Sequence, residues 1–153
     1  MNLIDELLEK IDVKNLRKTI LFSSIVIFII SLTQECFCTF KGCADSIIVL
    51  VFGFFGILSG GVGLSWFANP LIIASWILIK NNKISTILSI IAFVLSFSFL
   101  FFKEIMTDES GNLREILGYK LGYWLWLLSI FITLLGNLTV KIKLKRNNNL
   151  SQL

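Results

Sequence analysis

The sequence contains no histidine, a single proline and few charges for its length. Of its 153 residues, 16% are charged and 56% are hydrophobic, whereas soluble domains average about 25% charged and about 45–50% apolar residues. The missing histidine removes the commonest general base, near-neutral pH switch and zinc ligand. Catalysis by Ser/His/Asp or Cys/His groups within this chain is therefore excluded.

Charge is absent from four long segments, 19–34, 46–79, 84–102 and 121–140. These segments hold 89 residues, and the other 64 residues cannot enclose so large an apolar volume in water. A helix of about 20 residues crosses the hydrocarbon of a bilayer. The sequence predicts an all-α fold, an integral membrane four-helix bundle that forms one transmembrane domain over residues 1–153.

The basic residues predict how this bundle is oriented. They gather in 10–18, 80–83 and 141–146, which flank the apolar segments, and the loops 35–45 and 103–120 hold six acids and four bases. Lys and Arg are retained on the cytoplasmic side of short loops. We therefore expect a bacterial inner (plasma) membrane protein with both termini and the tail 141–153 in the cytoplasm. Nucleic-acid binding is not expected, because the bases form no surface stripe.

The second apolar segment, 46–79, is too long for one crossing. It contains Gly60 and Gly61, then Asn69 and Pro70, and both pairs favour a broken or kinked helix. Asn69 could satisfy a backbone group that a break leaves free. The break would be either a packing kink or the site of a transporter or channel, since some transporters bind substrate at broken helices.

Small residues recur at helical spacing in three segments. Such stripes let helix backbones approach closely in lipid. They predict packing either within the bundle or between copies in a homo-oligomer. The residues are Gly56 and Gly60; Ser85, Ser89, Ala92 and Ser96; and Gly118 and Gly122, with Ser129, Thr133 and Gly136 further along the last segment.

No charged residue interrupts the four apolar segments. Proton-coupled carriers keep ionisable groups inside the bundle, and intramembrane enzymes need a nucleophile with a base, or paired acids, at that depth. We therefore expect a protein that is not an enzyme and that has no cofactor.

Cys36, Cys38 and Cys43 all lie in the loop predicted to face outward. A disulfide is expected on the oxidising side of the membrane, with Cys43 joined to either Cys36 or Cys38. The third thiol would be free or would bridge to another subunit. No metal is expected without histidine, although an acid of the loop could complete a zinc site.

Residues 1–18 are predicted to form an amphipathic cytoplasmic helix. Because the segment carries four acids and four bases, adhesion to anionic lipid should be weak. It is either a docking element for a cytoplasmic protein or a helix packed at the interface. Its apolar positions are Leu3, Ile4, Leu7, Leu8 and Ile11.

The runs WFANPLIIASW, from Trp66 to Trp76, and LGYWLW, from Leu121 to Trp126, resemble small four-helix bacterial inner-membrane proteins. Among these the chain is similar in size and predicted topology to the membrane subunit of the Kiwa anti-phage defence system. The resemblance implies an oligomeric membrane sensor with a separate cytoplasmic effector, and it transfers no functional residue.

Three functions follow as hypotheses. The first is a membrane sensor or anchor that recruits a cytoplasmic partner. The second is a small transporter or channel that uses the break between Gly60 and Pro70. The third is an immunity protein against a pore-forming toxin.

Overall fold

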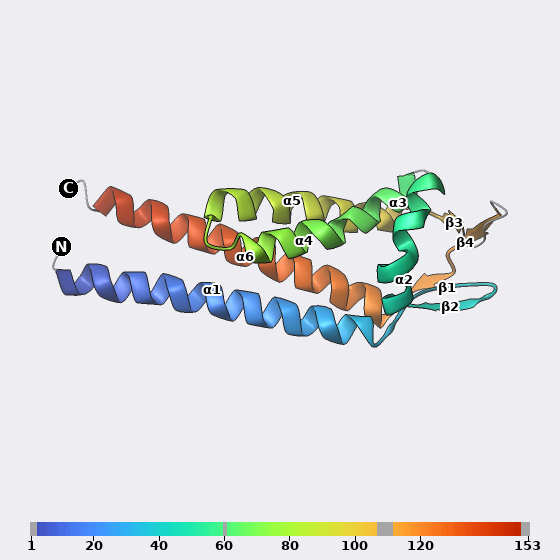
Figure 1. Ribbon diagram of the computed structural model, residues 1–153, viewed down its shortest axis with the longest axis horizontal. Helices are drawn as coiled ribbons and strands as arrows, with labels where there is room; N and C mark the ends of the chain where they lie inside the picture. Colours follow the sequence, from blue (N-terminus) through green and yellow to red (C-terminus); the bar gives the residue numbers. More distant parts are fainter. Residues whose placement is uncertain (1–2, 60, 107–111, 151–153) are drawn as a thin grey trace.

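A computed structural model describes the backbone of residues 3–59, 61–106 and 112–150, and the side chains of residues 12–56, 62–105 and 112–146. The protein is 76% helical (Figure 1). Its helices are α1 (Leu3–Leu32), α2 (Ser46–Phe52), α3 (Gly61–Leu64), α4 (Ala68–Ile77), α5 (Asn82–Ser98) and α6 (Leu121–Leu150), with the 3-10 helices η1 (Gly53–Ser59), η2 (Ser65–Phe67) and η3 (Phe99–Phe101). Its strands are β1 (Glu35–Thr39), β2 (Gly42–Asp45), β3 (Glu104–Met106), β4 (Leu113–Glu115) and β5 (Gly118–Tyr119).

Three helical segments are long and apolar enough to cross a membrane, namely Asp12–Leu32, Asn82–Phe101 and Leu121–Arg146. The predicted segment 46–79 instead forms two shorter apolar helical stretches, Ser46–Gly56 and Val62–Ile77. The fold is thus three long apolar helices and a divided fourth segment, not four equivalent crossings.

The long helices run along the molecule and leave the strands at one end (Figure 1). Both termini lie at the other end, and the turn between α4 and α5 points the same way. All three basic regions are therefore at the end that carries the termini. Helices α1 and α6 extend past the α4–α5 turn as a pair. We call this paired part, which includes Val13 of α1 and Val140 of α6, the terminal projection.

Helix α1 is continuous from Leu3 to Leu32. The predicted amphipathic helix 1–18 and membrane segment 19–34 both fall in α1, which has no break between them. Its sequence contains neither glycine nor proline, so nothing in it favours a kink. The predicted boundary at residue 18 is a change of composition within one helix.

The core lies where α1, α4, α5 and α6 meet. Phe28, Ala68, Ile72, Ala92 and Ile130 are buried against one another there. Large apolar side chains on the outer faces of these helices are exposed, among them Phe22, Ile29, Ile91, Val94 and Leu135. A membrane bundle presents such a surface, because lipid is its solvent.

The loops 35–45 and 103–120 contain strands, which the all-α prediction missed. One sheet has the order β2-β1-β5, and β3 pairs with β4 in a second sheet, all antiparallel. The hairpin between β1 and β2 turns at Gly42, whose φ of 130° is strained for any residue with a side chain. We call this end of the molecule, with its strands, α2 and η1, the strand cap.

Candidate functional site

The division of segment 46–79 lies near the predicted glycine break. Gly60 is outside the described residues, and Gly61 begins α3. Figure 1 shows the chain passing from α2, beside the base of the hairpin, across the end of the bundle to α3. A Cβ placed on Gly56 would lie 3.9 Å from the Cα of Gly63. Gly56 therefore approaches its own chain at Gly63, in ordinary van der Waals contact, and its role between copies stays a prediction.

The predicted break at Asn69 and Pro70 is wrong, because the chain remains helical there. Pro70 lies in the first turn of α4, directly after the 3-10 turn η2, where proline is tolerated. Asn69 Nδ2 donates to the carbonyl oxygen of Trp66 at 3.0 Å. That carbonyl is the one that an amide hydrogen at position 70 would have bonded in an α-helix. The prediction that Asn69 satisfies a freed backbone group is confirmed.

Asn69 also connects the divided segment to α6. Its Oδ1 accepts a hydrogen bond of 2.8 Å from Trp126 Nε1. Trp66 Nε1 in turn donates to the Leu50 carbonyl oxygen at 2.8 Å, which joins η2 to α2. These contacts fix α2, η2 and α6 relative to one another.

A second polar group lies inside the bundle at Trp76. Its Nε1 lies 3.1 Å from Ser24 Oγ and 3.0 Å from Thr133 Oγ1. Thr133 donates to Ser24 at 2.8 Å, and Ser24 donates to the Ser129 carbonyl oxygen at 2.8 Å. Trp76 is thus an interior hydrogen-bond donor between α1, α4 and α6.

The serine stripe of α5 packs within the chain. Asn137 Nδ2 on α6 lies 2.9 Å from Ser85 Oγ, 3.2 Å from Ser89 Oγ and 3.4 Å from Ser75 Oγ. Ser85, Ser89, Ala92 and Ser96 are all fully buried. The predicted homo-oligomer therefore draws no support from this stripe, and an interface between copies would use other faces.

The glycines of the last stripe do not share one helix, contrary to the prediction. Gly118 lies in β5, with open space around it, whereas Gly122 lies in α6. A Cβ on Gly122 would lie 2.6 Å from the Glu35 carbonyl oxygen, and one on Gly136 would lie 2.6 Å from Ile20. Gly122 and Gly136 thus allow α6 to approach β1 and α1 closely.

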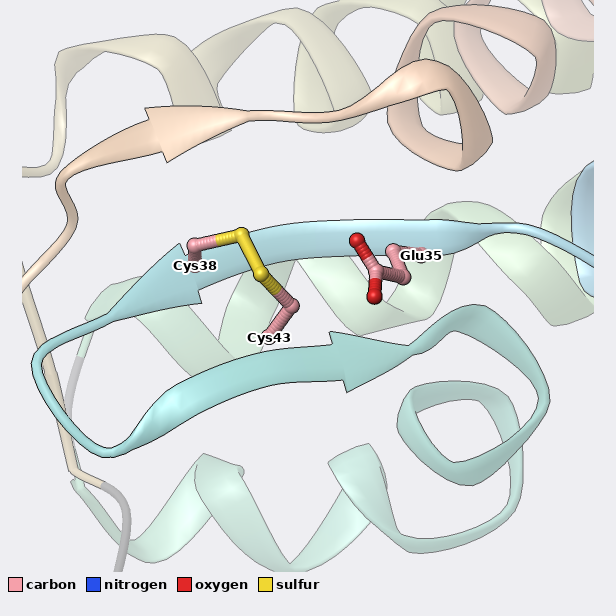
Figure 2. A group of neighbouring side chains, drawn as sticks. All are labelled: Glu35, Cys38 and Cys43. Carbon is pink, nitrogen blue, oxygen red and sulfur yellow. A yellow bond between two sulfur atoms is a disulfide. The ribbon is translucent and has the colours of Figure 1, made fainter.

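The cysteines of the hairpin separate into a disulfide and a buried thiol. Cys38 and Cys43 lie opposite each other on β1 and β2 and form a disulfide, as Figure 2 shows. This pairing is one of the two that the sequence left open. The strand register shifts between Glu35 and Phe37, so Cys36 and Phe37 are buried in succession. Burial raises the pKa of the Cys36 thiol to about 12, and the adjacent Ser46 hydroxyl lowers it less.

Glu35, Cys38 and Cys43 form the acid and thiol cluster from which a zinc site could be built. The three possible ligand atoms lie within 4.8 Å of one another, and Figure 2 shows the Glu35 carboxylate beside the disulfide. Zinc binds thiolates, not disulfide sulfurs. In the oxidised hairpin the cluster offers only one carboxylate, and these residues do not fit a zinc ion.

A large, half-open cavity lies at the strand cap. Its volume is about 1170 Å³. The hairpin, α2, η1, α3 and α6 each contribute to its wall. Buried side chains that line it include Cys36, Phe37, Ser46, Ser65, Asn69, Phe99 and Tyr123, and half-buried ones include Trp66 and Trp126. We call it the cap cavity.

Sequence reasoning missed the cap cavity. Its wall combines residues from segments far apart in the chain, and hydrophobic periodicity does not indicate how they meet. One signal was present: 46–79 is longer than a crossing requires, and the extra residues are those of α2 and η1, which cover the cavity. The predicted break residue Asn69 is part of the wall, whereas Pro70 is not.

The terminal projection is held together by contacts between α1 and α6. Val13, Ile20 and Val140 are buried together, and the Asp12 carboxylate forms an ion pair with the Lys143 ammonium group. The predicted docking side chains Leu3, Ile4, Leu7, Leu8 and Ile11 lie outside the described side chains, although their backbone belongs to α1.

Comparison of the chain with protein families, with curated proteins and with solved structures gave no match.

Proposed function

We propose that this protein is a non-enzymatic membrane sensor or anchor whose terminal projection recruits a cytoplasmic protein. The observation that carries the proposal is the pair of α1 and α6. These two helices run from the strand cap to the terminal projection without interruption (Figure 1). A change in how they pack at the strand cap would therefore reach the terminal projection through helices and not through loops.

The terminal projection has the properties of a docking surface. Lys14 and Lys18 on α1 are exposed, as are Lys141, Lys145 and Arg146 on α6. These bases lie on two helices whose apolar faces are used for pairing at Val13 and Val140. Over residues 12–18 and 141–146, a partner would therefore meet a basic, two-helix surface, and electrostatic complementarity predicts that its own surface is acidic.

A quantitative pull-down in gentle detergent tests the proposal. The full-length chain is compared with a variant that lacks residues 1–15 and with the double variant Lys14→Glu/Lys18→Glu. Lys103→Glu, which alters an exposed base on the strand-cap side, is the matched control. We expect one soluble protein to be retained by the full-length chain and by Lys103→Glu, and to be lost from both terminal variants.

If membranes that contain the full-length chain retain no more soluble protein than membranes without it, the recruiting role is wrong. Equal loss from Lys103→Glu would show that binding depends on net charge and not on the terminal projection. Anti-phage defence is the setting that the resemblance implies. Phage challenge of cells with and without the gene tests that setting independently of the pull-down.

A transporter or channel is the second proposal, supported by the position of Asn69 and Trp66 on the wall of the cap cavity. The packed core residues Phe28, Ala68, Ile72, Ala92 and Ile130 are not part of the cavity wall, and this favours binding over conduction. Flux assays in liposomes distinguish the two roles. Transport that Asn69→Ala changes would favour the transporter.

A further inference from the structure

We propose that the cap cavity binds an acyl chain of a membrane phospholipid. The inference goes beyond the proposed function, because it requires no cytoplasmic partner. It rests on the volume of the cavity, on the residues at its rim and on one buried hydroxyl group.

The cavity is half open and has the size of a ligand site. Ligand sites are typically about 300–1,000 Å³. At about 1170 Å³, the cap cavity belongs with ligand sites. Its wall is largely apolar, with Phe37, Val49, Val62 and Phe99 among its members. An extended apolar group fits this lining.

The rim indicates that the occupant comes from the bilayer. Ile48, Phe52 and Phe55 line the cavity and are 51%, 59% and 59% exposed, respectively. They lie on α2 and η1, whose other exposed side chains, Val51 among them, are also large and apolar. A rim of this kind is covered by lipid, so that a chain can enter sideways without crossing water.

A further part of the lining comes from the hairpin. Lys41, Gly42 and Cys43 line the cavity and are exposed. Lys41 adds a positive charge to a lining that is otherwise mostly apolar, and such a charge attracts a lipid phosphate. This combination matches a molecule with a fatty chain and an anionic head.

The buried hydroxyl is Ser46 Oγ. Ser46 lines the cavity and is 7% exposed, and its hydroxyl group lies beside the Cys36 thiol. A thiol is a weak hydrogen-bond acceptor, and the ester carbonyl of a phospholipid is a stronger acceptor that could enter with the chain. This group favours an acyl ester over a plain hydrocarbon.

Native mass spectrometry of the full-length chain tests the proposal. The protein is reconstituted in vesicles of phosphatidylethanolamine and phosphatidylglycerol, extracted in mild detergent and washed with lipid-free detergent. We expect one phospholipid per chain to survive the wash. The mass of the adduct distinguishes a phospholipid from a free fatty acid or a detergent molecule.

Gly56→Leu is the variant that should block the cavity. Gly56 lines it, and a Cβ there meets only ordinary van der Waals contact, 3.9 Å from Gly63. The added side chain displaces roughly two methylene groups of the lipid, so we expect the bound fraction to fall about tenfold. Val51→Leu is the matched control: Val51 is 57% exposed on α2 and does not line the cavity, so its bound fraction should be unchanged.

Ser46→Ala should lower the bound fraction about threefold, the effect of losing one hydrogen bond. If Gly56→Leu does not fold, Val62→Phe narrows the same cavity from α3. The proposal is overturned if the wild-type chain retains no lipid, if it retains only detergent or fatty acid, or if a folded cavity-filling variant retains phospholipid as the wild-type chain does.

Discussion

At the scale of single residues, two asparagines make several of the polar contacts between helices. Asn69 bonds the Trp66 carbonyl oxygen and the Trp126 indole, while Asn137 bonds serines of α4 and α5. Both are buried. Unsatisfied polar groups are costly in lipid, so these amides stabilise the fold and need no catalytic role to explain them.

Asn69→Leu should destabilise the protein by about 1–2 kcal/mol, because it leaves a carbonyl oxygen and an indole N–H without partners. Thermal unfolding in detergent, followed by tryptophan fluorescence, measures the change. The double variant Asn69→Leu/Trp126→Phe removes the orphaned indole donor as well. It should be less unstable than the sum of the single variants, and strict additivity would show that the hydrogen bond contributes nothing.

Cys36 makes stability depend on pH above 9. Its thiol pKa is about 12 in the folded protein and 9.0 ordinarily, so the unfolded chain loses the proton first as pH rises. The free energy of unfolding is unaffected below pH 9 and should fall by about 1 kcal/mol at pH 10. Unfolding at pH 8, 9 and 10 measures this slope, and Cys36→Ala should flatten it between pH 9 and 10. Burial also raises the pKa of Tyr119, so a slope above pH 10 should remain in that variant.

At the scale of elements, the state of the three cysteines in the β1–β2 hairpin can be tested by counting reactive thiols. Maleimide labelling without reductant at pH 8 should find no reactive thiol in the folded protein, because Cys36 is buried. One thiol should appear on denaturation, and three after reduction, since Cys38 and Cys43 form a disulfide. Three thiols without reductant would contradict both the disulfide and the placement of this hairpin on the oxidising side.

The serine stripe of α5 gives a second test at this scale. Ser89→Leu should destabilise the chain by roughly 1–3 kcal/mol, because Ser89 is fully buried against α6. Ile87→Leu, at an exposed position of the same helix, is the control and should be neutral. Thermal unfolding compares them. If the Ser89→Leu chain unfolds like the wild type but no longer self-associates, the stripe forms an interface between copies and is not a packing surface within one chain.

At the scale of the whole molecule, the three basic regions share one end of the bundle (Figure 1). The charge rule places this end in the cytoplasm. In a Cys36→Ala background that keeps the disulfide, Lys103→Cys should react with a membrane-impermeant maleimide in intact cells. Lys80→Cys and Lys145→Cys should react only after permeabilisation. The reverse pattern would invert the topology without changing the fold.

Much of the membrane architecture could be predicted from the sequence. Charge-free runs indicated α5 within a few residues and the start of α6, since apolar length and flanking charge are local properties, but α6 continues ten residues past the predicted end. The strands of the cap could not be found in this way. Each of them is five residues or shorter, and pairing such as that of β1 with β5 joins segments about 80 residues apart, which periodicity cannot reveal.

In the candidate site, too, local features could be predicted from the sequence and contacts between distant segments could not. Asn69 was predicted to satisfy a freed backbone group, because Pro70 beside it removes a helical donor whatever the tertiary structure. The hydrogen bond to Trp126 depends on α6 lying against α4, and nothing near Asn69 in the chain specifies that. Likewise, the sequence offered two partners for Cys43. The register of β1 and β2 selected Cys38, and the irregularity between Glu35 and Phe37 buried Cys36.

The sequence by itself determined that most of this chain is apolar enough to lie in a membrane, that its four long apolar segments carry no charged residue, and that most of its bases gather in three regions. These properties follow from composition and from short-range order. Only the tertiary structure decided that the small-residue stripe of α5 faces inward and that the surplus of segment 46–79 encloses a cavity beside a disulfide-bonded hairpin. These outcomes depend on which helix faces meet, and packing between distant segments determines that.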